Sequence, residues 1–227
     1  MKTTSKKGVW IALTILTLWT VSLLLLFQYP VSWVNPLTYL LVLWQAHLYT
    51  GVFITAHDAM HHTVSPNRRL NHAIGWLAAT LFAFNNYRNL YHKHHLHHRF
   101  VATDEDPDYH DGSFWAWYLS FARQYISIWQ ILIMALTFNL LILVFPQENV
   151  LLYWAIPSIL STFQLFYFGT YLPHRQSPDN RHKSRSQRQN HWVAFLTCYF
   201  FGYHYEHHNS PATPWWRLHR EKEREAL

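Results

Sequence analysis

Charged residues are scarce in this chain. Asp, Glu, Lys and Arg make up only 13% of it, whereas a soluble domain has about a quarter, so the composition argues against an ordinary soluble protein. Cysteine is almost absent, and the lone Cys198 excludes an internal disulfide. The chain also has no repeat of solenoid length and no long low-complexity tract. Residues 1–227 are therefore expected to form a single membrane-embedded domain.

Long stretches of the sequence carry no charge at all. No Lys, Arg, Asp or Glu occurs between Gly8 and His57, and Glu148 is the only charged residue from Gln124 to Leu172. Prolines and a short polar turn divide each stretch into two apolar runs of about twenty residues, the length that a helix needs to cross a bilayer. The sequence predicts four transmembrane helices, over about residues 9–28, 36–56, 122–145 and 150–172.

Two shorter apolar runs lie outside these spans, from Ala73 to Phe84 and from Trp192 to Tyr203. Runs of this length are too short to cross a bilayer and are typical of buried or re-entrant helices. We expect interfacial helices over about residues 72–91 and 191–205. The predicted fold is an all-α integral membrane protein with four transmembrane helices and short helices against one membrane face.

The positive charges indicate how the spans are oriented. All 18 Lys and Arg residues fall on one side of the predicted spans, and the two outer turns near Tyr29 and Gln147 carry none. Because Lys and Arg are enriched in cytoplasmic loops, both termini are predicted in the cytoplasm, with the protein in the inner (cytoplasmic) membrane. Orientation and attraction to anionic lipid account for the net charge of +6, so no nucleic-acid partner is expected.

Histidine is as abundant as charge is rare, with 18 residues, most of them at the cytoplasmic ends of the spans. Two triplets have the spacing i, i+3, i+4 and one pair has the spacing i, i+4, which places each set on one helical face. Eight converging imidazoles exceed the four to six ligands of one transition metal, so two metals are implied. With a ninth candidate in the segment "LPH", the predicted metal ligands are His57, His61, His94, His97, His98, His174, His204, His207 and His208.

Four further histidines lie near these sets without sharing their faces. His62, His92, His95 and His110 are less expected as ligands, although any of them remains an alternative to a residue of the set. Carboxylates also lie within or beside the histidine groups. Such groups orient metal-bound imidazoles by accepting their second N–H, the role predicted for Asp58, Asp106, Asp108 and Glu206.

Four motifs together carry a resemblance to a known family. The segments "FITAHDAMHHTV", "HHLHHR" with "DPDYH", "FYFGTYLPHR", and "CYFFGYHYEHH" with "PATPWW" resemble those of the bacterial β-carotene ketolases. That family is similar to the wider superfamily of membrane fatty-acid desaturases and hydroxylases, which has three histidine boxes. The likeness runs from about Tyr49 to Trp216, and it departs from the expected pattern at His62, where a small residue is expected.

The resemblance implies a non-haem di-iron oxygenase that uses O₂ to convert the C4 methylene of a carotenoid β-ionone ring to a ketone, through two successive hydroxylations and a dehydration. It implies two iron ions held by the histidine boxes, with His174 completing the set. A carotenoid hydroxylase or a fatty-acid desaturase or hydroxylase with the same site remains an alternative. A metal-transporting or metal-storing membrane protein is an alternative of a different class.

The sequence also suggests how substrate and electrons arrive. An apolar polyene dissolved in membrane lipid is expected to enter sideways between helices, against aromatic residues such as Phe168, Tyr171 and Phe201. No flavin, haem or nicotinamide motif is present, so the electrons for O₂ activation are expected from a ferredoxin-type donor. That donor is predicted to dock on the basic cytoplasmic face by charge complementarity.

Overall fold

The computed structural model describes residues 6–225 and contains no strand among them. The first five elements are α1 (Lys7–Leu26), α2 (Pro36–Met60), α3 (Arg68–Leu81), α4 (Tyr87–Arg99) and α5 (Phe114–Tyr125). They are followed by α6 (Ile128–Leu141), α7 (Gln147–Val150), η1 (Leu151–Ala155), α8 (Ile156–Phe166), η2 (Tyr167–Tyr171) and α9 (Leu172–His174). The last elements are α10 (His191–Cys198), α11 (His204–Asn209), η3 (Trp215–Arg217) and α12 (Leu218–Glu225). The predicted all-α fold is confirmed.

Three helices are long and apolar enough to cross a membrane. They are α1, α2 and the continuous helix Gln147–His174, in which α7, η1, α8, η2 and α9 follow one another without a break. The start of α2 is set by Asn35, whose side chain accepts a hydrogen bond from the Leu37 amide, and by Pro36 at the first helical position. These helices correspond to the predicted spans 9–28, 36–56 and 150–172.

The span predicted over 122–145 is not one straight helix. In its place α5 and α6 meet at a bend of 83°, so the chain has three or four candidate spans, depending on whether the bent pair counts as one. The break follows from local capping, because Ile126 is extended and the Ser127 side chain caps α6 by accepting from the Gln130 amide. Among the residues of α6, only Gln130 is buried.

Both predicted interfacial helices are also broken into two. The range 72–91 covers α3 and α4, which are separated at Ala83 and Phe84, both with positive φ, and Asn86 caps α4. The range 191–205 covers α10 and the start of α11, separated where Tyr199 and Phe200 adopt the left-handed conformation. After each break a new helix begins, α4 or α11, and each of these helices holds a histidine triplet. The break allows that helix to run in a different direction from the one before it.

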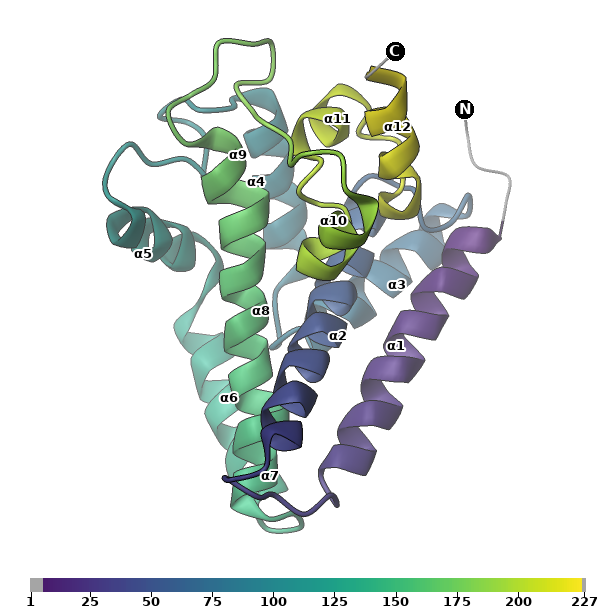
Figure 1. Ribbon diagram of the computed structural model, residues 1–227, viewed down its shortest axis with the longest axis vertical. Helices are drawn as coiled ribbons and strands as arrows, with labels where there is room; N and C mark the ends of the chain where they lie inside the picture. Colours follow the sequence, from purple (N-terminus) through teal and green to yellow (C-terminus); the bar gives the residue numbers. More distant parts are fainter. Residues whose placement is uncertain (1–5, 226–227) are drawn as a thin grey trace.

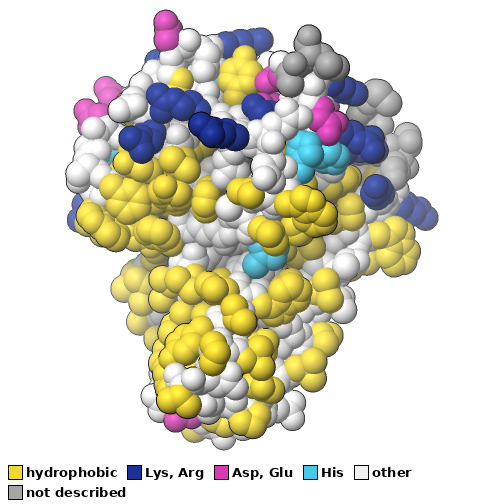
Figure 2. All heavy atoms as spheres, in the orientation of Figure 1, with side chains coloured by type: hydrophobic (Ala, Val, Ile, Leu, Met, Phe, Trp, Pro, Cys, Tyr) yellow, Lys and Arg dark blue, Asp and Glu magenta, His cyan; other side chains and the backbone are white. Residues whose placement is uncertain are grey.

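The helices form a bundle with an apolar end and a polar end. In Figure 1, α1, α2, α6 and α8 run lengthwise and converge at one end, while α4, α9, α11 and α12 lie at the other. Figure 2 shows the convergent half covered mainly by hydrophobic side chains and the Lys and Arg side chains gathered at the opposite end. Leu136 and Leu140 of α6, for example, are more than half exposed. This division is typical of a protein whose narrow half lies in lipid.

Candidate metal centre and adjoining cavity

Eight histidines meet in two groups of four at the polar end of the bundle. Within each group, one ring nitrogen from every residue lies within 4.8 Å of those from the other three. The first quartet is His57, His61, His94 and His207, and the second quartet is His97, His174, His204 and His208. Helices α2, α4, α9 and α11 therefore supply one centre between them, although its residues span about two thirds of the sequence.

His98 lies between the quartets. Its Nε2 is 3.0 Å from Nε2 of His207 in the first quartet. Its ring stacks on that of His208 in the second quartet, with 4.2 Å between the ring centroids. All nine predicted ligand residues are thus brought together, with eight in the quartets and His98 where it can serve either.

The nitrogen geometry fits metal ligation. Nε2 of His61 is 2.6 Å from Nε2 of His94, and Nε2 of His208 is 3.1 Å and 3.0 Å from Nε2 of His97 and His204. Ligands at about 2.1 Å from one metal stand about 3 Å apart when they are neighbours. Both ring nitrogens of His57 are buried without a hydrogen-bond partner among the described residues. Such nitrogens would be costly to bury unless a metal occupied them.

The electrostatic surroundings keep most of these rings neutral, as metal binding requires. Burial lowers the pKa of His61, His94, His204, His207 and His208 well below the usual value, and neighbouring imidazoles lower it further. A proton is disfavoured on each ring because it would be desolvated and close to other rings. The lone pairs are therefore available to a cation.

Two of the predicted carboxylates lie against His97. Nδ1 of His97 is 2.9 Å from Oδ1 of Asp106, and Asp106 also accepts from the amides of Ala102 and Asp108. Burial opposes protonation of His97, but Asp108 and Asp106 raise its pKa overall. Asp108 itself accepts from the Tyr125 hydroxyl, and burial raises its pKa to about 6. This arrangement fixes Nδ1 of His97 as the protonated nitrogen and leaves Nε2 for the metal.

The remaining two carboxylates differ in their surroundings. Oδ1 of Asp58 is 3.7 Å from Nδ1 of His57, and its Oδ2 accepts from the Trp215 amide. Among the described residues, no hydrogen bond or ion pair joins the Glu206 carboxylate to a quartet histidine. Its buried carboxylate pairs with Lys222 of α12 at 2.8 Å and accepts from the Ser186 hydroxyl. Because position 206 faces away from the shared face of α11, Glu206 holds α12 against α11 instead of orienting an imidazole.

The four histidines considered as alternatives lie outside the quartets. His92 and His95 are exposed, and His95 stacks on Tyr91. His62 has positive φ and turns toward Asn71. The ring of His110 accepts from the Gly112 amide.

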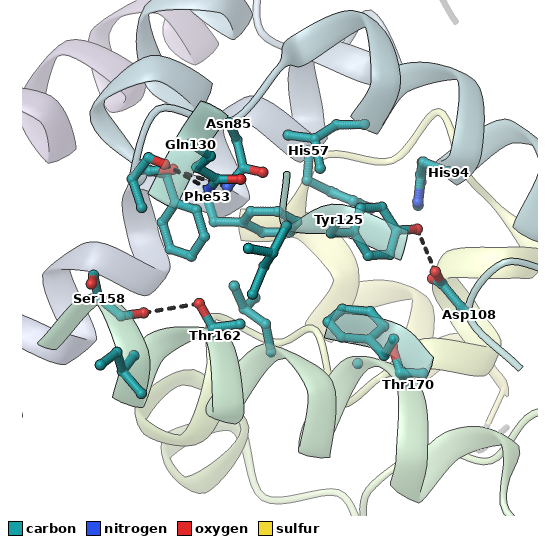
Figure 3. A pocket seen from close by; sticks show the side chains of 18 of the residues that line it. Phe53, His57, Asn85, His94, Asp108, Tyr125, Gln130, Ser158, Thr162 and Thr170 are labelled. Atoms are coloured by element: carbon teal, nitrogen blue, oxygen red, sulfur yellow. Dashed lines mark hydrogen bonds between the residues drawn. The ribbon is translucent and has the colours of Figure 1, made fainter. Parts of the chain in front are cut away.

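An apolar cavity of about 340 Å³ adjoins the histidines. His57, His94, His97 and His204 line one end of it. Ile131 of α6 and Ile159 of α8 line it too, and both are more than half exposed, so the cavity opens between these helices on the apolar surface. Figure 3 shows this interior, with His94 and Asp108 at one end and Ser158 at the other.

Of the three residues predicted to contact substrate, one lines the cavity and two do not. Phe201 lines the cavity, with its ring centroid 4.8 Å from that of His57. It reaches this position because Gly169 has no side chain, and a Cβ there would lie 2.2 Å from the Phe201 ring. Phe168 and Tyr171 do not line the cavity; Tyr171 instead packs against Phe114. Residues 168 and 171 flank the two cavity-facing positions of η2, so their side chains point elsewhere.

Several lining residues were not anticipated from the sequence. Phe53, Phe121, Tyr125, Gln130 and Thr170 come from four separate helical segments. No local pattern marks them, because they come together only where α2, α5, α6 and η2 pack in the folded chain.

Known proteins similar to this chain share one family. The chain matches the model of the fatty acid desaturase family over residues 31–127 and 113–227. It is 43% identical over 177 residues to a beta-carotene ketolase of Paracoccus sp. (strain N81106 / MBIC 01143), covering 75% of this chain and 73% of that one. The chain belongs to the fatty acid desaturase family, among its β-carotene ketolases. The resemblance found in the sequence is confirmed, and the names of these ketolases indicate an oxidoreductase.

Longer ketolases are also similar. A beta-carotene 4-ketolase 3 of Haematococcus lacustris is 40% identical over 184 residues, and a zeaxanthin 4-ketolase of Chlamydomonas reinhardtii is 43% identical over 183 residues. Each alignment covers 75% of this chain, but only 58% and 41% of the respective relatives. No solved structure was found to match the chain.

Proposed function

We propose that this ketolase introduces a keto group at C4 of carotenoid β-ionone rings, taking β-carotene to echinenone and canthaxanthin. The observation that carries the proposal is that two histidine quartets each contribute two rings to one end of an apolar cavity that opens on the apolar surface. Relatives that share at least 40% of aligned residues are named as carotenoid ketolases, and two of them are named as 4-ketolases. A long polyene is the kind of substrate that such a cavity accepts.

We propose two iron ions as the cofactors, one in each quartet. Iron is one of the metals that neutral imidazole binds well. Iron bound there would supply O₂ activation and removal of hydrogen from the allylic C4 position. Each turnover at C4 consumes one O₂, two electrons and two protons, and releases one water. The first gives an alcohol and the second a geminal diol, which loses water to form the ketone.

The protein's own side chains bind and orient the ring in this scheme. Phe201, Phe53 and Leu165 line the cavity beside or beyond the histidines, so they exclude water and favour a ring over a polar ligand. Asp106 and Asp108 hold the His97 ring in one orientation and tautomer. A cavity of about 340 Å³ suits one ring and the adjoining part of the polyene, so the rest of the carotenoid would extend past Ile131 and Ile159 into lipid.

We further propose that the polar end faces the cytoplasm, as the gathered Lys and Arg side chains favour. A tag added to the carboxyl terminus is expected to be protected from protease applied outside intact cells, and digestion of that tag would contradict this orientation.

A ferredoxin-type donor would dock on this end. Full-rate turnover of the purified protein with NADPH and no carrier would argue against such a donor.

The function is tested by expressing the chain in a host that makes β-carotene and identifying the pigments by chromatography and absorption. We expect echinenone and canthaxanthin from the wild type and unchanged β-carotene from His207→Ala. Products hydroxylated at C3 without any ketone would instead indicate a carotenoid hydroxylase. A newly desaturated lipid without any ketone would indicate a fatty-acid desaturase. Feeding zeaxanthin separately shows whether 3-hydroxylated rings are accepted.

A further inference from the structure

One hydroxyl on the cavity wall has no hydrogen-bond partner within residues 6–225. Thr170 lines the cavity from the π-helical turn η2 and is only 4% exposed. Among the described residues its side chain makes no hydrogen bond, whereas Thr162, on the same continuous helix, donates to the carbonyl of Ser158 at 2.9 Å. The π turn shifts the backbone register at Thr170 away from the ordinary α-helical pattern.

Each of the other neutral polar side chains around the cavity already donates a hydrogen bond within the protein. Gln130 donates to the Ala83 carbonyl and Asn85 to the Phe82 carbonyl. Ser158 donates to the Ala155 carbonyl, and the Tyr125 hydroxyl donates to Asp108. Figure 3 shows the last of these contacts as a dashed line. A hydroxyl that faces an apolar cavity without a partner in the protein is suited to a ligand that brings a hydrogen-bonding group.

Thr170 lies at the histidine end of the cavity. It precedes His174 of the second quartet by one helical turn, and it follows Gly169, against which Phe201 packs. Figure 3 places Thr170 on the wall below His94 and Asp108, away from Ser158. An oxygen atom attached to the ring carbon that faces the quartets would therefore lie at the Thr170 end of the cavity and away from Ser158.

We propose that the Thr170 hydroxyl hydrogen-bonds the C4 oxygen of the alcohol formed in the first turnover and retains this intermediate for the second. The inference rests on the proposed two-step function and makes Thr170 a determinant of the product. Thr170 binds the new hydroxyl, so the remaining C4–H turns toward the quartets. Without this bond the alcohol is free to leave for the lipid before the second oxidation, because the other neutral polar side chains of the wall already donate their hydrogen bonds within the protein.

The test compares Thr170→Val, which keeps the shape and removes the hydroxyl, with Thr170→Ser, which keeps the hydroxyl. Both are expressed in a β-carotene-producing host, and the ratio of 4-hydroxylated to 4-keto carotenoid is measured beside iron per chain. Since one hydrogen bond is worth a factor of roughly three to ten, Thr170→Val is expected to raise the ratio by about that factor at unchanged iron content. Thr170→Ser is expected to remain near the wild-type ratio. Thr20→Val, on α1 and away from the cavity, is the matched control.

An unchanged ratio in Thr170→Val, or the same rise in Thr20→Val, would overturn the inference. Loss of both products from Thr170→Val at normal iron content would overturn it as well, since Thr170 would then act on the first oxidation. These results differ from failure of the proposed function, in which the wild type itself would form no ketone.

Discussion

Asp106 accepts a hydrogen bond from Nδ1 of His97 at 2.9 Å, and both side chains are almost completely buried. The contact joins the loop after α4 to the second quartet. It orients the ring from outside the centre. The amides of Ala102 and Asp108 donate to the carboxylate and hold it in place, and its second oxygen, Oδ2, lies 3.0 Å from Nδ1 of His97. His97 is thus positioned by a loop as well as by its own helix.

Asp106→Asn is expected to lower iron affinity or ketone formation by about 10- to 100-fold, the usual cost of losing a carboxylate partner of a metal-bound imidazole. Iron per chain at limiting iron and pigment yield measure the effect. Asp111→Asn is the control, because the Asp111 side chain is 92% exposed and lies 3.9 Å from His110, outside the quartets. Equal behaviour of the two variants would contradict the role of Asp106.

Removal of a quartet histidine is expected to cost more. His204→Ala deletes a ring whose Nε2 lies 3.0 Å from that of His208, and ketone formation should fall by at least about 100-fold. His92→Ala, at an exposed position on α4, should retain wild-type product. Pigment analysis at matched protein levels makes the comparison, and ketone formation by His204→Ala would refute the assignment of that ligand.

Gly169→Ala tests the packing that brings Phe201 beside the quartets. The added Cβ would lie 2.2 Å from the Phe201 ring, so the ring must move, at a cost of about 1–3 kcal/mol. We expect a lower melting temperature in detergent and less ketone. Adding Phe201→Leu to Gly169→Ala should recover most of the stability. If Gly169→Ala alone is as stable as the wild type, the close packing is not required.

Lys222→Met tests the ion pair that attaches α12 to α11. Lys222 neutralises the fully buried carboxylate of Glu206, and its loss leaves an unpaired buried charge, which costs about 3–5 kcal/mol. Lys222→Met should therefore unfold at a lower denaturant concentration than the wild type. The double variant Lys222→Met with Glu206→Gln should recover much of the lost stability. Arg224→Met is the control, since its exposed pair with Glu221 is worth at most about 1 kcal/mol. If Arg224→Met is destabilised as much as Lys222→Met, the burial of Glu206 does not explain the loss of stability.

The histidine spacing predicted the centre better than hydropathy predicted the helices. The triplets in α4 and α11 share helical faces because an i, i+3, i+4 pattern depends only on local geometry. The break between α5 and α6 was missed because the run remains apolar through Ile126 and Ser127. The Ser127 cap is a local signal of that break, but apolar composition conceals it.

Other features depend on contacts that no local pattern encodes. The pairing of Glu206 with Lys222 requires α12 to fold back over α11, and hydropathy says nothing of that approach. The cavity-facing direction of Thr170, in place of Phe168 and Tyr171, follows from the π turn η2. Such a turn has no sequence signature of its own, and its effect on side-chain direction appears only in the folded helix.

The most direct test of the centre is the iron content of the purified, detergent-solubilised chain. Two irons per chain are expected in the wild type, because each quartet offers four converging nitrogens. His174→Ala, which alters only the second quartet, is expected to lower that number while the helical content by circular dichroism stays unchanged. A wild-type value of one iron or none under iron-replete conditions, in a preparation that forms ketone, would contradict the two-metal account.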